Sequence, residues 1–149
     1  PDVEQENLFD EPMIAAVPAN HPLTRHPPSM KELSEVPMIT FPAGAGPNFS
    51  DITQGLFHRR GLRVNVIQQV NDVQTALSLV ASDMGFTLVP EQVRRLQREG
   101  VDYMPLEDDN ITTPVIASRR RGENPNAVMR LTNTILAELV ENRLTGRYP

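Results

Sequence analysis

The sequence contains no cysteine and only one lysine, Lys31. The absence of cysteine excludes disulfides, thiolate catalysis and cysteine-ligated metals, although it does not fix the compartment. No run of apolar residues approaches the roughly 18 that a membrane helix needs, and no signal peptide opens the chain. The net charge is −5, and an acidic surface repels phosphate backbones. These absences disfavour a membrane protein and a segment that binds nucleic acid by itself.

The composition is that of an ordinary folded domain. Apolar residues make up 39% and charged residues 22% of the sequence, so a buried core is expected and disorder is not. A chain of 149 residues can form one domain or most of a two-lobed one. Because the sequence opens abruptly on PDVEQENLF, we expect an N-terminally truncated part of a longer protein.

Apolar runs and turn residues alternate so that strands and helices are predicted in succession. Strands are predicted at 12–17, 38–41, 63–67, 86–89, 101–106 and 114–117, and helices at 31–36, 47–61, 71–85, 90–100 and from 124 onwards. Asn71 followed by Gln74 has the spacing of a capping box. An apolar stripe on the last helix is most simply core, although it could also serve a subunit interface; it comprises Val128, Leu131, Ile135 and Leu139. The alternation indicates an α/β fold with a parallel-rich sheet.

Three predicted helix starts follow directly on strands, at 42–49, 69–73 and 89–91. In open α/β sheets, ligands bind beyond the carboxyl ends of the strands, where helix N-termini converge. The first turn is the best candidate for a small anion because Gly44 and Gly46 let a ligand approach the backbone closely. The N–H groups of Asn48, Phe49 and Ser50 lie on the open first turn of the following helix.

The side chains near these turns indicate what kind of ligand would fit. Phe49 and Val73 would form an apolar wall for a flat or unsaturated body. Asp72, in the second turn, disfavours a second anion there. Since a Gly/Pro turn before a helix is also common without any ligand, a purely structural role remains an open alternative.

Several stretches of the sequence resemble one known family. AAVPANHPL, PMITFPAGAGPNFSD, NDVQTALSLVASDMG and FTLVPEQV are similar to the effector-binding domain of LysR-type transcriptional regulators. The most specific match is VQTALSLVASDMGFTLVP, which is close to the family's usual pattern ALxLVAAGxGISLVP. The similarity extends from about Glu11 to Leu144. PNFS further resembles the branch that governs degradation of aromatic compounds, whose inducers include benzoate, muconate and chlorinated relatives.

The resemblance implies an α/β, two-lobed, periplasmic-binding-protein-like (type 2) fold with one lobe complete and the other partial. Residues 1–17 and 115–149 would belong to the partial first lobe, and residues 18–114 would form the second lobe. The inducer would lie between the lobes. It would contact Gly46, Pro47, Asn48 and Phe49 on a loop, with Val73 and Val115 on the cleft wall.

The resemblance also implies a function and partners. The chain would be the sensor of a cytoplasmic regulator that binds a small aromatic or dicarboxylic acid and alters transcription. Such regulators are homodimers or tetramers that contact DNA through a winged helix-turn-helix, which is absent from this chain. First-lobe segments that usually supply hydroxyl ligands for the inducer are also absent. No cofactor, metal or catalytic residue is expected.

Two other functions remain open from the sequence. An extracytoplasmic solute-binding protein shares the lobed architecture, whereas an enzyme is disfavoured because no nucleophile–base pair emerges. His21, His26 and His58 lack the spacing of metal ligands, and the acidic run 107–109 lacks the glycine of a calcium loop. Arg119–Arg121 are expected to form a solvated turn at a strand end.

Overall fold

The chain divides into two compact units in a computed structural model that describes residues 3–41, 49–121 and 127–144. The first unit comprises Pro1–Asp10 and Pro114–Pro149, and the second unit is Glu11–Thr113. The sequence predicts lobes at 1–17 with 115–149 and at 18–114. These lobe boundaries remain a prediction, since the two units are a division by contacts within the chain.

The second unit contains a mixed sheet in which one strand runs against the others. β1 (Val3–Pro18) pairs antiparallel with both β4 (Thr87–Pro90) and β5 (Val101–Pro105). The expectation of a parallel-rich sheet is wrong for β1. Its two partners come much later in the chain, so the alternation of strands and helices between them does not fix the direction of β1.

The rest of the sheet is parallel, as the alternation predicts. β2 (Met38–Thr40) pairs parallel with β3 (Val66–Gln69). A parallel bridge from Met38 to Phe86, the residue before β4, joins this pair to the larger sheet. The three strands β2, β3 and β4 therefore point the same way and end at the same edge.

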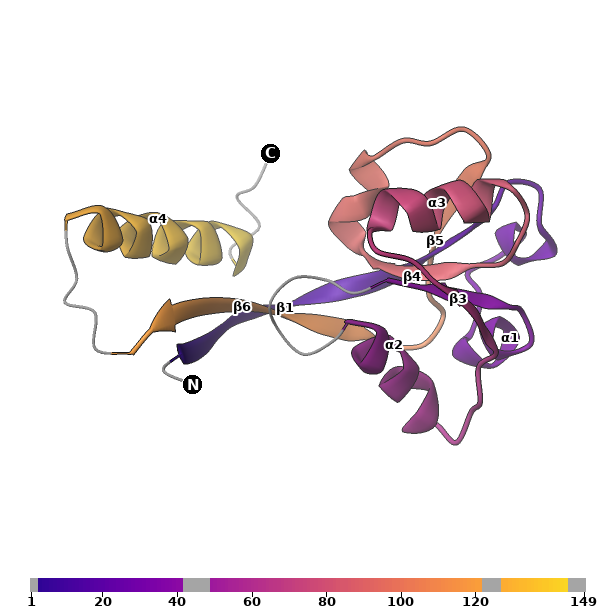
Figure 1. The fold of residues 1–149 in the computed structure, drawn as a ribbon, viewed down its shortest axis with the longest axis horizontal. Helices are drawn as coiled ribbons and strands as arrows, with labels where there is room; N and C mark the ends of the chain where they lie inside the picture. The colour runs from indigo at the N-terminus through magenta and orange to yellow at the C-terminus, as the bar shows by residue number, and fades with distance from the viewer. Residues whose placement is uncertain (1–2, 42–48, 122–126, 145–149) are drawn as a thin grey trace. The chain divides into compact units, whose positions relative to one another are not determined.

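Helices cover both sides of this sheet. α3 (Val73–Ala81) lies on one side, and α1 (Met30–Ser34) and α2 (Phe49–His58) lie on the other (Figure 1). α3 packs its buried Ala76, Leu77 and Val80 against the sheet, as the apolar spacing of this segment predicts. Short 3₁₀ turns, η1 (Pro22–Thr24) and η2 (Glu91–Arg95), complete the unit. η2 replaces the longer helix expected at 90–100.

The cap of α3 is Asp72, which corrects the expectation of a capping box at Asn71. The Asp72 carboxylate accepts hydrogen bonds from the Thr75 backbone N–H at 2.8 Å and from the Thr75 hydroxyl at 2.9 Å. Because these hydrogen bonds from Thr75 favour the ionised form, the pKa of Asp72 is lowered from its ordinary 3.8.

This cap predicts a pH dependence of stability. A carboxyl whose pKa is lower in the folded chain stabilises it above the unfolded pKa, and loses that contribution as the pH falls through the folded pKa. Asp72→Asn keeps a capping oxygen but cannot titrate. The difference in free energy of unfolding between the original chain and Asp72→Asn should therefore shrink between about pH 5 and about pH 2. Urea unfolding across that range measures the difference, and a constant difference would show that folding does not lower the pKa of Asp72.

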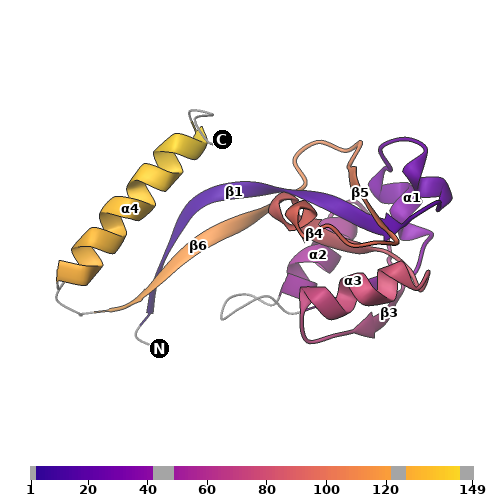
Figure 2. The same cartoon turned by 90° about the horizontal axis from the view of Figure 1, so that it is seen from above.

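The first unit is a two-stranded ribbon with one helix. β6 (Thr112–Arg120) runs beside β1 (Figure 2), and α4 (Ala127–Leu144) follows it. β1 begins nine residues before the predicted start because its first half is polar and mostly exposed, so it carries no apolar signal. The solvated turn expected at Arg119–Arg121 is found only at Arg121, because Arg119 and Arg120 are the exposed last residues of β6. Glu4 pairs with Arg119 at 2.9 Å and with Arg121 at 3.7 Å.

α4 exposes the stripe that its sequence predicts to be core. Leu131, Ile135 and Leu139 are 62%, 47% and 38% exposed. A helical apolar period shows which side chains share a face, but it does not show what covers that face.

Candidate functional site

Three helical segments begin at the carboxyl edge of the parallel strands in the second unit. α2, α3 and η2 follow β2, β3 and β4 in sequence. Since those strands are parallel, the three N-termini lie at one edge of the sheet, where ligands of open α/β folds bind. This arrangement confirms the predicted order of strand ends and helix starts.

Two of these three N-termini carry a carboxylate of the chain itself. Asp72 caps α3, as described above. The Glu11 carboxylate accepts a hydrogen bond from the Gln92 backbone N–H at 3.2 Å, in the first turn of η2. Glu11 is 6% exposed, so its carboxyl group lies close to that turn and away from bulk water. At either position a bound acid would have to displace a carboxyl group that already accepts a hydrogen bond from the helix start. The first turn of α2 also carries an acidic residue, Asp51, but its side chain is exposed to solvent, so we retain the start of α2 as the candidate.

The start of α2 is fixed by aromatic packing. The rings of Phe49 and Phe41 stack with centroids 5.0 Å apart and planes inclined by 28°, and each residue is 5% exposed. Ser50 and Thr53 are also buried, and the Thr53 hydroxyl donates to the Ser50 carbonyl at 3.0 Å. A helix start held in this way presents its first backbone N–H groups in a defined direction.

The structure locates half of the residues predicted to contact the effector. Gly46, Pro47 and Asn48 lie outside the described residues. Phe49 and Val73 open α2 and α3 in the second unit, and Val73 is half-buried. Val115 lies half-buried on β6 in the first unit. The contacts of all six with an effector stay a prediction.

A buried hydroxyl without a partner lies at the carboxyl end of β2. Thr40 Oγ1 makes no hydrogen bond within the described part of the chain, and Thr40 is 2% exposed. The hydroxyl of Thr87, at the start of β4, shares this property. Since a second such hydroxyl lies away from the strand end, the state of Thr40 alone does not indicate a ligand.

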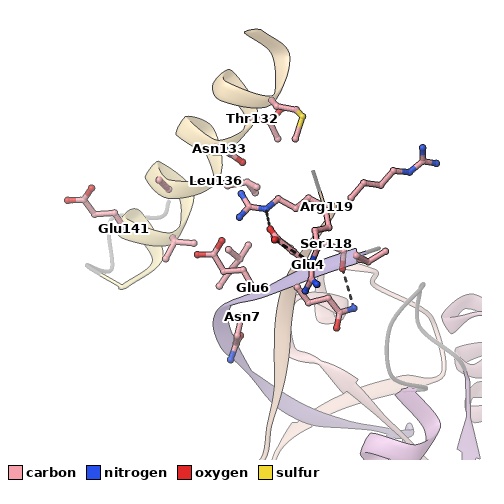
Figure 3. Close-up of a pocket in the computed structure, with 18 residues that line it drawn as sticks. Glu4, Glu6, Asn7, Ser118, Arg119, Thr132, Asn133, Leu136 and Glu141 are labelled. Atoms are coloured by element: carbon pink, nitrogen blue, oxygen red, sulfur yellow. Dashed lines mark hydrogen bonds and ion pairs between the residues drawn. The ribbon is translucent and has the colours of Figure 1, made fainter. Parts of the chain in front are cut away.

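A large cavity lies within the first unit. It measures about 1430 Å³ and is lined by residues 3–8 of β1, by residues 117–121 at the end of β6 and by one side of α4. Figure 3 shows Glu4 and Arg119 on the ribbon, with Thr132 and Leu136 on the helix. Small-molecule pockets usually measure about 300–1,000 Å³. Because the cavity is larger than that range and none of the predicted effector contacts lines it, we do not assign the effector to it.

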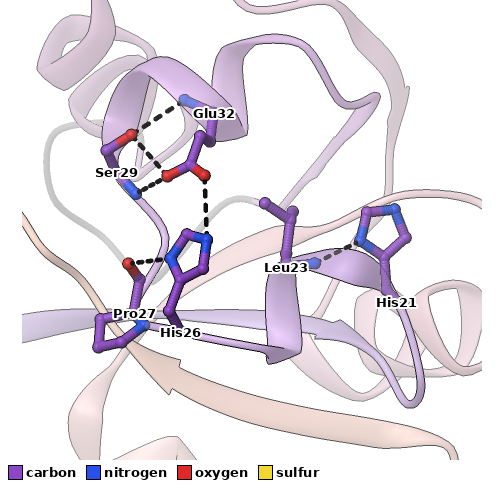
Figure 4. A network of polar contacts seen from close by, with 6 residues as sticks. All are labelled: His21, Leu23, His26, Pro27, Ser29 and Glu32. Atoms are coloured by element: carbon purple, nitrogen blue, oxygen red, sulfur yellow. Dashed lines mark hydrogen bonds and ion pairs between the residues drawn. The ribbon is translucent and has the colours of Figure 1, made fainter.

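Two of the three histidines, His21 and His26, make contacts within local turns. The His21 Nδ1 atom accepts a hydrogen bond from the Leu23 N–H at 3.2 Å, and His26 lies 3.4 Å from the carboxylate of Glu32 (Figure 4). Within residues 3–41, 49–121 and 127–144, no three His, Cys, Asp or Glu residues are grouped so that they could hold a metal. None of the helices in that part of the chain combines the length and apolar character needed to cross a bilayer.

The acidic run 107–109 has a structural role that its sequence did not suggest. Asp108 accepts a hydrogen bond from the Met30 backbone N–H at 2.6 Å and so ties this turn to the start of α1.

Comparison with known proteins identifies relatives that are named transcriptional regulators. The chain is 35% identical to the HTH-type transcriptional regulator CatR of Pseudomonas putida over 141 residues, which are 95% of this chain and 48% of CatR. It is 31% identical to the HTH-type transcriptional regulator BenM of Acinetobacter baylyi over 138 residues, 91% of this chain and 45% of BenM. The chain thus spans about half the length of the curated relatives it matches.

The fold is shared with a solved effector-binding domain. The structure of the BenM effector-binding domain with its effector benzoate superposes with a TM-score of 0.82 at 26% identity, over 100% of this chain and 67% of that one. The type 2 periplasmic-binding-protein-like fold expected from the sequence is confirmed by this likeness. Residues 1–140 match the family described as the LysR substrate binding domain. The chain therefore belongs to the LysR substrate-binding domain family.

Proposed function

We propose that this chain senses a small carboxylic acid, and that the acid binds where α2 begins. The observation that carries the proposal is the state of the three helix N-termini at the sheet edge. Those of α3 and η2 are occupied by the carboxylates of Asp72 and Glu11. The start of α2, at Phe49, is thus the place that we propose for the acid, because the one acidic residue that the described part of its first turn carries, Asp51, is exposed to solvent.

The comparisons support an acid of aromatic character. The BenM effector domain was solved with benzoate, and this chain shares its fold and 26% of its sequence in that alignment. In this proposal Phe49 and Val73 would supply apolar contacts on the second unit, and Val115 would supply them on the first. A dicarboxylic acid is the second candidate, because the family resemblance extends to muconate-responsive regulators.

The energetics require several contacts besides the helix start. An anion gains roughly 0.3–1 kcal/mol from a helix N-terminus, and up to about 2 kcal/mol when partly buried. Micromolar affinity needs about 8 kcal/mol. At least about three quarters of the binding free energy must therefore come from other hydrogen bonds and apolar contacts, including those from Pro47, Asn48 and the opposite lobe.

We extend the proposal to the whole protein as follows. The full-length protein is a cytoplasmic regulator, a homodimer or tetramer, that contacts DNA through a winged helix-turn-helix outside this chain. Acid binding stabilises one arrangement of the lobes and, by linkage, changes the geometry of the DNA-binding parts. A role in solute transport is disfavoured because the named relatives are transcriptional regulators. For the same reason we propose that the protein is not an enzyme.

Calorimetric titration of the full-length protein with benzoate, muconate and benzamide tests the acid-binding proposal. Benzamide keeps the ring and removes the charge, so a helix-start site should bind benzoate at least about tenfold more tightly, a difference of about 1.4 kcal/mol. Phe49→Leu should weaken benzoate binding by a similar factor. Phe57→Leu, in the last turn of the same helix, should not. Equal affinities for benzoate and benzamide, or no binding of any acid, would refute the proposal.

A further inference from the structure

We infer that Phe41 is a positioning residue for the acid site: its ring holds Phe49, and with it the first turn of α2, in the orientation that distinguishes an acid from a neutral ligand. This inference rests on the proposed function, because it concerns how the helix start recognises a charge. Phe41 itself is not proposed to touch the ligand.

The backbone next to Phe41 is hydrogen-bonded within the sheet. The residue before it, Thr40, ends β2, and the Thr40 carbonyl accepts a hydrogen bond from the Val70 backbone N–H at 2.9 Å. Val70 follows the last residue of β3 and is 9% exposed. The backbone is therefore paired across two parallel strands up to the residue that precedes Phe41.

The stack carries this fixed position across to α2. Phe49 is the first residue of the helix, and its ring centroid lies 5.0 Å from that of Phe41. Offset-stacked rings at this separation attract each other beyond their apolar burial, and both residues are 5% exposed. The sheet thereby determines the direction in which the first N–H groups of α2 point.

Orientation of those groups matters more for a charged ligand than for a neutral one. Hydrogen bonds to an ionised acceptor are stronger and depend on donor geometry. A small rotation of the helix start would therefore lower the affinity for an acid while the apolar contacts that hold a neutral ring persist. The ratio of benzoate affinity to benzamide affinity measures this effect. A general loss of folding stability would lower both affinities and leave the ratio unchanged.

The chain offers a matched control on the same helix. Phe57, in the last turn of α2, packs edge-on against Phe86, with ring centroids 6.2 Å apart and planes inclined by 61°. The two residues are 1% and 0% exposed. Phe57→Leu removes an equally buried ring from an aromatic pair at the far end of the helix.

The experiment compares Phe41→Leu, Phe41→Tyr and Phe57→Leu in the full-length protein by calorimetry with benzoate and benzamide, after their melting temperatures are measured. We expect Phe41→Leu to lower benzoate affinity at least tenfold and to reduce the benzoate-to-benzamide ratio at least fivefold. Phe41→Tyr, which keeps the ring, should restore the ratio. Phe57→Leu should lower the melting temperature and leave the ratio unchanged.

Two results would overturn the inference. One is an unchanged ratio in Phe41→Leu when the original protein prefers benzoate, and the other is an equal loss of the ratio in Phe57→Leu. Phe41→Met provides the same comparison should Phe41→Leu unfold. If the original protein shows no preference for benzoate, the proposed function itself fails, and that outcome is distinct from both.

Discussion

Replacing Gly85 with alanine is expected to destabilise the chain by roughly 2–4 kcal/mol. A Cβ at this position would lie 2.2 Å from the carbonyl oxygen of Pro37 and 2.9 Å from its carbonyl carbon. The same oxygen accepts a hydrogen bond from the Phe86 N–H at 2.9 Å. Any shift of Pro37 that relieves the contact must weaken the bond that joins β2 to β4. Urea unfolding followed by circular dichroism measures the loss.

Gly61→Ala is the control for this substitution. Gly85 and Gly61 both have a positive φ, +156° and +69°. At Gly61, however, an added Cβ would meet nothing within 4 Å. Only the left-handed backbone then opposes alanine, at a cost of about 1–2 kcal/mol. If Gly85→Ala proved no more destabilising than Gly61→Ala, the close approach of Pro37 to Gly85 would not be a feature of the folded chain.

Leu77→Ala is expected to cost about 2–5 kcal/mol because it opens a cavity in the core. Leu77 is fully buried on α3, which packs against β2 and β4. The same substitution at Leu131 on α4, which is 62% exposed, should change the free energy of unfolding of this 149-residue chain by less than about 0.5 kcal/mol. Thermal or urea unfolding of both variants compares them directly.

The contrast between these two leucines decides whether the α4 stripe is covered. Equal losses for the two variants would show that the stripe is buried in solution, contrary to its exposure in the structure. A large loss at Leu77 alone would confirm that α3 is core and that α4 presents an apolar face.

Local signals in the sequence predict most elements of the second unit. The apolar spacing of Ala76, Leu77 and Val80 correctly places the buried face of α3. Gly61 adopts the left-handed conformation expected of a residue that closes a helix. These features depend on residues a few positions apart, which a pattern along the chain contains.

Features that depend on tertiary contacts were predicted poorly. Asn71 and Asp72 each have a hydrogen-bonding residue three positions later, and only the extended backbone of Asp72, with φ −154° and ψ 163°, selects it as the cap. The first half of β1 is held by pairing with β6, of which its polar sequence gives no indication. The stripe on α4 has the same period as that on α3, and only the structure distinguishes an exposed face from a buried one.

In the candidate site, too, the features set by local sequence were predicted and those set by tertiary contacts were not. The order of strand ends and helix starts follows from the sequence, and so does the expectation that Asp72 repels an anion. The hydrogen bond between Glu11 and the start of η2 could not be predicted, because Glu11 lies 81 residues before the Gln92 N–H that it binds. The role of Phe41 was missed as well. It follows the last residue of β2 and lies eight residues before another phenylalanine, but that the two rings stack becomes visible only in three dimensions.

The central claim is that a small acid binds at the start of α2, and the most direct test is amide NMR of the full-length protein titrated with benzoate. The account predicts saturable shifts that are largest for the N–H groups of Phe49 and its neighbours in the first turn, with small shifts along α4. Shifts confined to the cavity between the β1–β6 ribbon and α4, with the α2 signals unmoved, would contradict it.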